Sequence, residues 1–285
     1  MDLIQAIVLG IVQGLTEFLP ISSTAHLRIV PSLLGWNDPG AAFTASIQLG
    51  TLLAVLIYFR RDLWGALVGW IKSFRGGEAA KTTDAKLGWA IVIGSIPIGV
   101  LGLLFQKKIE GSLRSLYVIA GALIVMGILM WIADRVPDRM KSLDQTSVGA
   151  GIWVGFWQAI ALIPGASRSG STITGALFWG MDRETAARFS FMLSVPAILA
   201  AALYSFKQHA QELLHDMLVP MLVANLFSFI TGYAAIAFLI KFLQTKSPTV
   251  FVVYRIALGI LLLVLLSRGI LTPMVGIPEA GGTGN

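Results

Sequence analysis

The sequence predicts an all-α, polytopic membrane protein, because it is rich in apolar residues that gather into long stretches. Of its 285 residues, 56% are hydrophobic and only 13% are charged, whereas a soluble domain carries about 25% charged residues. A helix needs roughly 17–25 residues to cross a bilayer. Stretches of about this length cover residues 41–59, 87–105, 116–133, 189–206, 217–240 and 250–267. They are too long for barrel strands and lack strand alternation, so we expect helices.

A repeated order of residues predicts that the chain consists of two similar halves, about residues 1–135 and 146–269. The matches are Gly10-x-x-Gln13 with Gly155-x-x-Gln158, Pro20-x-x-Ser23 with Pro164-x-x-Ser167 (one residue out of register), and Phe43, Ala54, Tyr58 with Phe189, Ala200, Tyr204. Each half is expected to contain a re-entrant helix hairpin plus three transmembrane helices. Since three is odd, the halves are predicted to be inverted-topology repeats.

Each half begins with two apolar segments that are too short to cross the bilayer. Residues 3–16 are interrupted by Glu17 and Pro20, and residues 149–164 are followed by a return leg, 169–179. Polar, non-helical backbone at membrane depth is tolerated only where protein or a water-filled cavity surrounds it. We therefore expect the tips of two hairpins to meet near the midplane, where paired interrupted segments indicate a binding site.

The basic residues predict the orientation of the chain. With these spans, thirteen of the 21 lysines and arginines lie on one side and six on the other, while Arg168 and Arg255 lie within spans. The positive-inside rule places the basic side in the cytoplasm, so both termini and the mouth of the first hairpin are expected to face outward. Residues 1–272 are expected to form a single integral membrane domain, followed by a disordered Gly/Pro-rich tail, 273–285.

Composition also argues against several functions. The chain has no cysteine, so it has no thiol nucleophile, disulfide framework or thiolate metal site. It lacks the basic face or aromatic-basic motif of a nucleic-acid-binding protein, so we attribute its net charge of +6 to topology and expect the bilayer as its surroundings. The first residues lack the basic segment of a cleavable signal, so the first apolar segment is expected to be retained.

The first hairpin carries a candidate cation site. Gln13 and Glu17 are four residues apart and share one helix face. Their oxygens could hold Mg²⁺ or Ca²⁺, with water and substrate phosphate as the other ligands. Alternatively, Glu17 is a buried protonated acid or helix-end hydrogen-bonding group, and Gln13 is a structural amide.

A hydroxyl-rich turn follows, with a histidine one helical turn beyond it. Ser22 and Thr24 are candidates for helix caps or phosphate contacts, and Ser23 could direct its hydroxyl at phosphorus. His26 could reach Ser23 as a general base, or protonate a leaving oxygen. Ionisable side chains at membrane depth are candidates for function by default.

The second hairpin carries a candidate phosphate site. A flexible turn precedes a helix, whose first N–H groups can bind phosphate oxygens, and the planar guanidinium of Arg168 can bind two oxygens at once. The candidate contacts in this turn are Gly165, Ser167, Ser169 and Gly170. The alternative for Arg168 is a structural ion pair with Glu17. Arg255 is expected to be a snorkelling or a supporting arginine.

In these two clusters the chain resembles the bacterial undecaprenyl-pyrophosphate phosphatase family, the BacA-type enzymes. The matching motifs are the (Glu/Gln)-x-x-x-Glu pattern at Gln13 and Glu17, Pro-x-Ser-Ser-Thr-x-His at residues 20–26 and Pro-Gly-x-Ser-Arg-Ser-Gly at residues 164–170. The resemblance covers nearly the whole chain apart from the tail. It implies a plasma-membrane phosphatase that converts C55 polyprenyl diphosphate to the monophosphate carrier lipid. It also implies a divalent cation, a site that opens to the periplasm, and a link to bacitracin resistance.

The resemblance implies catalytic or binding roles for Glu17, Ser23, His26, Ser167 and Arg168. Gln13 stands where the family often has glutamate, and Ala25 replaces a glycine. The nucleophile is left open between Ser23, His26 and water, and the oligomeric state between a monomer and a homodimer. The alternative function is a transporter or flippase of a lipid phosphate or small anion, since inverted repeats with broken helices are a transporter architecture. The pairing of Ser23 with His26 favours an enzyme, and a combined hydrolase and flippase is left open.

Overall fold

The computed structural model describes residues 1–136, 140–211, 215 and 217–273, and throughout these residues the regular structure is helical, without strands. The α-helices are α1 (Leu3–Phe18), α2 (Ser23–Leu34), α3 (Gly40–Ser46), α4 (Gln48–Tyr58), α5 (Arg60–Ser73), α6 (Thr83–Gly94), α7 (Ile96–Leu104), α8 (Gln106–Glu110), α9 (Leu116–Ala133), α10 (Val148–Ile160), α11 (Arg168–Phe178), α12 (Arg183–Gln211), α13 (Leu218–Thr245) and α14 (Thr249–Ser267). Short 3₁₀ turns are η1 (Gly77–Lys81), η2 (Ser112–Arg114) and η3 (Leu143–Gln145). The all-α prediction is confirmed.

The helices long and apolar enough to cross a membrane coincide with the six apolar stretches of the sequence. Five such helices lie in the described part of the chain: Thr83–Leu104, which joins α6 and α7, together with α9, α12, α13 and α14. A sixth candidate is the pair Ala42–Tyr58 and Arg60–Ser73, whose two arms meet at an angle of 83°. The prediction of a polytopic membrane protein is therefore confirmed.

Two pairs of shorter helices form the hairpins. The α1 and α10 helices are apolar but have only 16 and 13 residues. Each begins at a capping side chain, because Asp2 accepts a hydrogen bond from Gln5 N and Ser147 accepts one from Ala150 N. Such caps satisfy helix N–H groups that otherwise have no partner. Each helix is followed by a turn and a second short helix, α2 or α11.

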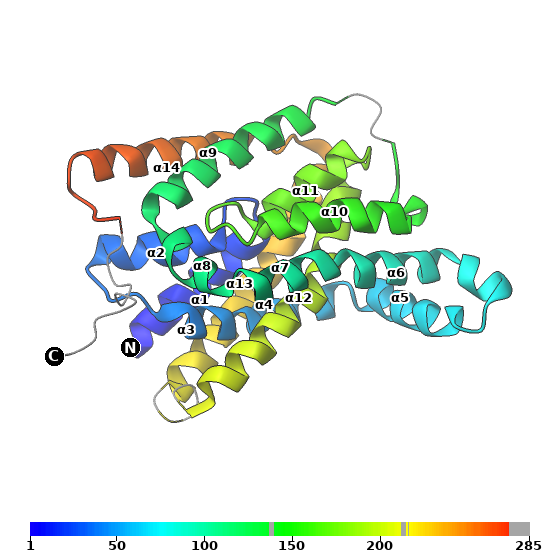
Figure 1. Ribbon diagram of the computed structural model, residues 1–285, viewed down its shortest axis with the longest axis horizontal. Helices are drawn as coiled ribbons and strands as arrows, with labels where there is room; N and C mark the ends of the chain where they lie inside the picture. The colour runs from blue at the N-terminus through cyan, green and yellow to red at the C-terminus, as the bar shows by residue number, and fades with distance from the viewer. Residues whose placement is uncertain (137–139, 212–214, 216, 274–285) are drawn as a thin grey trace.

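Each hairpin packs against a helix of the other half of the sequence. The α1 helix lies along α13, and α10 lies along α6 (Figure 1). A Cβ at Gly10 would lie 2.4 Å from the carbonyl oxygen of Ala224, and one at Gly155 would lie 2.3 Å from that of Gly94. Glycine at these contacts lets the helix backbones approach closely. The packing agrees with two intertwined halves, while their inverted orientation and the single-domain boundary at 272 stay predictions.

The α9 and α14 helices lie side by side along one flank of the molecule, above the hairpin helices α2 and α11 (Figure 1). Buried residues of α2, α9 and α14 form one apolar cluster that includes Ala25, Ile29, Leu123 and Leu262. This cluster fixes the return leg of the first hairpin on α14.

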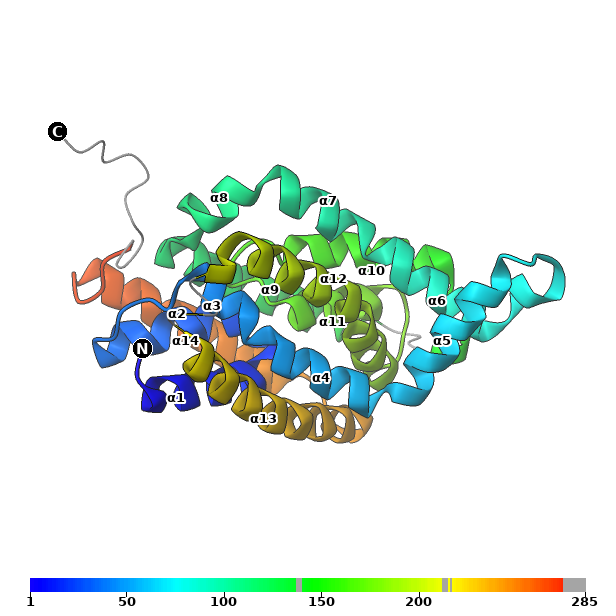
Figure 2. The same ribbon diagram turned by 90° about the horizontal axis from the view of Figure 1, so that it is seen from below.

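The α5 helix is a feature that the sequence analysis did not predict. It packs beside α6, and the two helices project from one end of the molecule (Figures 1 and 2). At their contact the indole N–H of Trp89 donates to the hydroxyl of Ser73 at 2.9 Å, and the rings of Trp70, Phe74 and Trp89 cluster.

The predicted disordered tail lies almost entirely outside the described residues. Pro273, its first residue, is described, and its carbonyl oxygen accepts a hydrogen bond from Leu116 N at 3.0 Å. This contact attaches the end of the described chain to the start of α9.

Candidate active site

The tips of the two hairpins share an unusual backbone conformation. Ser22 and Ser167 are the N-caps of α2 and α11, and within the described residues they alone, glycines aside, have positive φ, 75° and 70°. Each serine side chain accepts a hydrogen bond from the backbone N–H three residues on. Positive φ costs energy for a residue with a Cβ, and such strain gathers at functional sites.

These two caps correct the register of the sequence match. Ser22, not Ser23, is the structural counterpart of Ser167. Gly10 and Gly155 are separated by the same number of residues as Ser22 and Ser167, so the two matches agree without a shift of one residue. The match of Pro20 with Pro164 gave the shifted register, because the two turns place proline at different distances before the cap.

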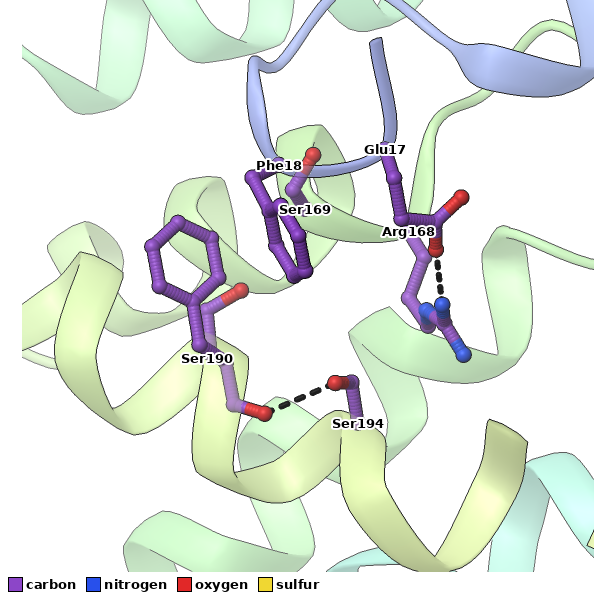
Figure 3. Close-up of a pocket in the computed structure, with 7 residues that line it drawn as sticks. Glu17, Phe18, Arg168, Ser169, Ser190 and Ser194 are labelled. Atoms are coloured by element: carbon purple, nitrogen blue, oxygen red, sulfur yellow. Dashed lines mark hydrogen bonds and ion pairs between the residues drawn. The ribbon is translucent and has the colours of Figure 1, made fainter. Parts of the chain in front are cut away.

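A charged pair joins the two tips. Glu17, near the end of α1, is 6% exposed, and its Oε1 accepts a hydrogen bond from Arg168 Nη2, so the two form an ion pair (Figure 3). Its Oε2 accepts two more hydrogen bonds, from Gln13 Nε2 at 2.9 Å and from Ser23 Oγ at 2.7 Å. Both oxygens of this carboxylate are thus engaged, and the ion pair that the sequence offered as an alternative exists in this structure.

A small pocket opens at this ion pair. It is lined by Glu17, Phe18, Arg168, Ser169, Ser190, Phe191 and Ser194 (Figure 3). The last three residues belong to α12 and are not among the residues that the sequence indicates. Serines in an otherwise apolar helix are common, so nothing in the sequence alone marked Ser190 and Ser194 as part of the pocket.

His26 is directed toward α14 and not toward Ser23. Its Nδ1 lies 2.8 Å from the carbonyl oxygen of Ser22, and its Nε2 lies 2.6 Å from the hydroxyl of Tyr254. The expected hydrogen bond between Ser23 and His26 is replaced by the one from Ser23 to Glu17. Side chains three residues apart on a helix can face each other, so the cause lies in the packing of α2 against its neighbours: Ser23 meets Glu17 on α1, and His26 meets Tyr254 on α14.

Most of the other predicted contacts hold the two turns together. Gly165 N donates to Thr24 Oγ1 at 3.4 Å, and Ser169 Oγ donates to the carbonyl oxygen of Leu19 at 3.2 Å. Gly165 has a φ of 93°, and a Cβ there would lie 2.5 Å from the Ile119 carbonyl oxygen. A Cβ at Gly170 would lie 2.4 Å from Arg255 Nη1. The structure therefore gives each glycine a packing reason, and their contact with phosphate stays a prediction.

Arg255, on α14, binds the backbone of both turns. Its side chain is fully buried, and its Nη1 donates to the carbonyl oxygen of Pro20 at 3.0 Å. Its Nη2 donates to the carbonyl oxygens of Gly165 at 3.1 Å and Ala166 at 2.8 Å. The carbonyl oxygens of Ala122 and Leu123 on α9 complete its contacts. Arg255 is thus a supporting arginine, as the sequence suggested.

The side chains near Glu17 could supply only a few ligands to a bound cation. The described residues contain no group of three or more histidine, cysteine, aspartate or glutamate side chains that could hold a metal. Gln13, however, is fully buried, and its Oε1 has no hydrogen-bond partner. Rotation of its amide would present that oxygen beside the Glu17 carboxylate. Glu17 and Gln13 could therefore supply two oxygens to Mg²⁺ or Ca²⁺, which also binds water and phosphate readily.

The fold and this site define a polytopic membrane protein with two short hairpins whose tips carry an acid, an arginine and several hydroxyls. Residues 6–261 match the family model described as bacitracin resistance protein BacA. The chain belongs to the BacA family.

Several proteins are similar to this chain over nearly their whole length. An undecaprenyl-diphosphatase of Myxococcus xanthus is 50% identical over 277 residues, which cover 97% of this chain and 93% of that protein. An undecaprenyl-diphosphatase of Chloroherpeton thalassium is 52% identical, covering 94% and 98%. Undecaprenyl-diphosphatase 2 of Streptomyces coelicolor is 48% identical, covering 99% and 100%.

Proposed function

We propose that this protein is an undecaprenyl-diphosphatase, which hydrolyses undecaprenyl diphosphate to undecaprenyl monophosphate and phosphate. The reaction regenerates the carrier lipid for cell-wall synthesis. The observation that carries the proposal is the pairing of Arg168 with Glu17 at a pocket inside an apolar helix bundle. The similarity to undecaprenyl-diphosphatases over 93% or more of each chain supports hydrolysis over the transporter alternative.

Arg168 is the proposed phosphate ligand. To bind the diphosphate, its guanidinium exchanges the Glu17 carboxylate for phosphate oxygens, which it can contact in pairs. Catalysis of phosphoryl transfer rests largely on such positioning and charge stabilisation. The first turn of α11, which begins at Arg168, adds backbone N–H groups and the positive end of the helix dipole.

Glu17 is the proposed cation ligand, with Gln13 as its neutral companion. Released from Arg168, the Glu17 carboxylate would be a buried charge without compensation, which is costly. A bound Mg²⁺ or Ca²⁺ would supply positive charge to this carboxylate and to the diphosphate. Gln13 would then direct its free carbonyl oxygen, in place of its amide N–H, at the same position.

The geometry favours Glu17 as the acceptor of a proton from Ser23. Ser23 Oγ already donates to Glu17 Oε2 at 2.7 Å, whereas His26 is engaged with Ser22 and Tyr254. If Ser23 is the nucleophile, Glu17 is in place to take its proton as the bond to the terminal phosphorus forms. The bond from that phosphorus to the bridging oxygen breaks, undecaprenyl monophosphate leaves, and water then hydrolyses the phosphoserine to release phosphate. If water attacks instead, Ser23 and Glu17 are placed to orient it. Trapping of a phosphoserine after acid quench would distinguish these two routes.

We further propose a location in the bacterial plasma membrane, with the first hairpin opening to the periplasm. The charge distribution supports this orientation. This orientation suits a substrate whose diphosphate is left on the outer face of the membrane.

The decisive experiment uses purified protein in detergent with undecaprenyl diphosphate and follows phosphate release. Release that requires a divalent cation and stops with EDTA supports the proposal. The matched control is Arg168→Ala, which should release no phosphate above background. If the wild-type protein releases no phosphate at any cation concentration, but moves lipid phosphates across vesicles, the transporter alternative is correct.

A further inference from the structure

Both ring nitrogens of His26 have hydrogen-bond partners, and the partners are of different kinds. Nδ1 faces the carbonyl oxygen of Ser22 at 2.8 Å, and Nε2 faces the hydroxyl of Tyr254 at 2.6 Å. A carbonyl oxygen can only accept a hydrogen bond, so Nδ1 carries a proton. In the neutral ring, Nε2 then has a lone pair and accepts the hydrogen bond that the tyrosine hydroxyl donates. The partners of the two nitrogens thus define one tautomer.

We propose that Tyr254 is a positioning residue that holds His26 with its proton on Nδ1 and its unprotonated Nε2 directed at the tyrosine hydroxyl. The inference deepens the proposed function and rests on it, since it concerns the histidine of the same hairpin. The hydroxyl of Tyr254 contacts Nε2 of His26 directly, so the proposed role of Tyr254 is exerted through the imidazole.

The position of Tyr254 is fixed by its neighbour in the chain. Arg255 is fully buried and binds the carbonyl oxygens of Pro20 and Ala166, one in each hairpin turn. Further along α14, a Cβ at Gly259 would lie only 2.9 Å from the carbonyl oxygen of Ala120. These contacts prevent α14 from rotating or sliding against α9 and the turns. The Tyr254 hydroxyl is thus held at one place relative to α2.

The hydroxyl of Tyr254 suits both protonation states of His26. A phenol both donates and accepts hydrogen bonds, so it can donate to the neutral Nε2 and accept from it once Nε2 is protonated. The Ser22 carbonyl accepts from Nδ1 in both states. The imidazole can therefore gain or lose a proton at Nε2 without turning, which a general acid or base requires.

The charged and polar groups around His26 come from α14, α1 and the start of α2. Arg255 approaches from α14, and its positive charge faces the imidazole. Glu17, on α1, is engaged with Arg168, Gln13 and Ser23. From its own helix His26 meets only the Ser22 carbonyl as a polar partner.

The first test measures the tautomer directly by ¹⁵N NMR of protein labelled at histidine. The chain contains only three histidines, and the variants His209→Gln and His215→Gln assign the resonances. At neutral pH, we expect His26 to show a protonated Nδ1 and an unprotonated, hydrogen-bonded Nε2. Tyr254→Phe should shift the Nε2 resonance toward that of a nitrogen without a hydrogen bond, while the matched control Tyr204→Phe should not. Tyr204 also has a hydrogen-bonded hydroxyl, which contacts Gln106 and Gln208 on the surface side of α12.

The second test measures turnover of undecaprenyl diphosphate by the same variants. We expect Tyr254→Phe to lower kcat by about tenfold or more, as loss of an orienting partner does, with KM changed by less than about threefold. The low-pH limb of the rate profile should also move, because the hydroxyl contacts both protonation states of the imidazole and does not stabilise them equally. Tyr204→Phe should match the wild type in both respects. Tyr254 is 43% exposed, so the phenylalanine is expected to fit.

A proton on Nε2 of His26 in the wild type, or unchanged His26 resonances in Tyr254→Phe, would overturn the inference. These spectra need no substrate. A protein that proves inactive toward undecaprenyl diphosphate but shows the expected tautomer would therefore refute the proposed function and leave the inference standing.

Discussion

Arg168 and Glu17 form an ion pair that links the start of α11 to the end of α1, so the basic residue of one hairpin neutralises the acid of the other. Both side chains are largely buried, and removal of one partner would leave an uncompensated charge in an apolar bundle. If Arg168 is the phosphate ligand, as we propose, an incoming diphosphate has to compete with Glu17 for it. The first two predictions follow from this competition.

Arg168→Lys should lower kcat/KM by about 100-fold or more, although it keeps the positive charge. A lysine ammonium cannot bind two phosphate oxygens with the planar geometry of a guanidinium, and loss of one stabilising group costs about that much. Phosphate release and thermal unfolding should be measured together, with Arg188→Lys as the control. Arg188 pairs with Asp62 and Glu184, outside the pocket. If Arg168→Lys retains most of the wild-type turnover, Arg168 is a general electrostatic group and no phosphate clamp exists.

Glu17→Gln should abolish activity or raise the cation concentration needed for half-maximal rate by at least about tenfold. Hard divalent cations prefer carboxylate oxygen, and affinity rises with the number of charged ligands. Titration of Mg²⁺ and Ca²⁺ against initial rate measures the effect. An unchanged cation requirement in a variant with residual activity would assign Glu17 a proton-transfer or structural role instead.

Gln13 provides the matched comparison on the same helix face. Gln13→Ala should leave a measurable enzyme, because it removes only a neutral oxygen. Gln13→Glu should lower the cation concentration for half-maximal rate, since it places a second carboxylate one turn from Glu17. A higher requirement in Gln13→Glu would show that the amide N–H donated to Glu17 matters more than the free oxygen.

The sequence predicts the spans, and it singles out the charged residues that the structure brings together at the two tips, for one physical reason. Hydrocarbon excludes polar groups, so apolar stretches such as 116–133 and intramembrane ions such as Glu17 and Arg168 stand out. The residues that contact these side chains cannot be predicted in the same way, because such contacts depend on packing between segments that are distant in the sequence. Tyr254 reaches His26, and Ser190 lines the same pocket as Arg168, because α14 and α12 pack against the hairpins. The sequence also placed Ser23 with His26, but tertiary packing gives Ser23 to Glu17 and His26 to Tyr254.

Arg255→Lys should destabilise the protein and abolish activity together, unlike Arg168→Lys. A lysine cannot reach the five carbonyl oxygens that the guanidinium binds, and those of Pro20, Gly165 and Ala166 lie in turns without helical partners. We expect a loss of about 3–5 kcal/mol in the free energy of unfolding, as for other broken buried charge networks.

Thermal unfolding in detergent measures this loss. Arg268→Lys is the control, since Arg268 is exposed at the end of the same helix. If Arg255→Lys unfolds at the wild-type temperature but is inactive, Arg255 contacts the substrate and does not merely support the turns.

The orientation of the chain gives the last prediction. The segment between α5 and α6 should face the cytoplasm, and the segment between α8 and α9 should face outward, because the basic residues divide thirteen to six between the two sides. The chain has no cysteine, so a single introduced cysteine reports its own side.

The labelling sites are chosen from the backbone conformation. Gly76 and Gly77 have positive φ, so cysteine there would be strained. Ala80 and Ser112 are exposed and free of this problem. In intact cells an impermeant maleimide should label Ser112→Cys but label Ala80→Cys only after the membrane is permeabilised. Labelling of Ala80→Cys in intact cells would reverse the orientation, and the pocket at Glu17 would then have to receive its substrate from the cytoplasmic side.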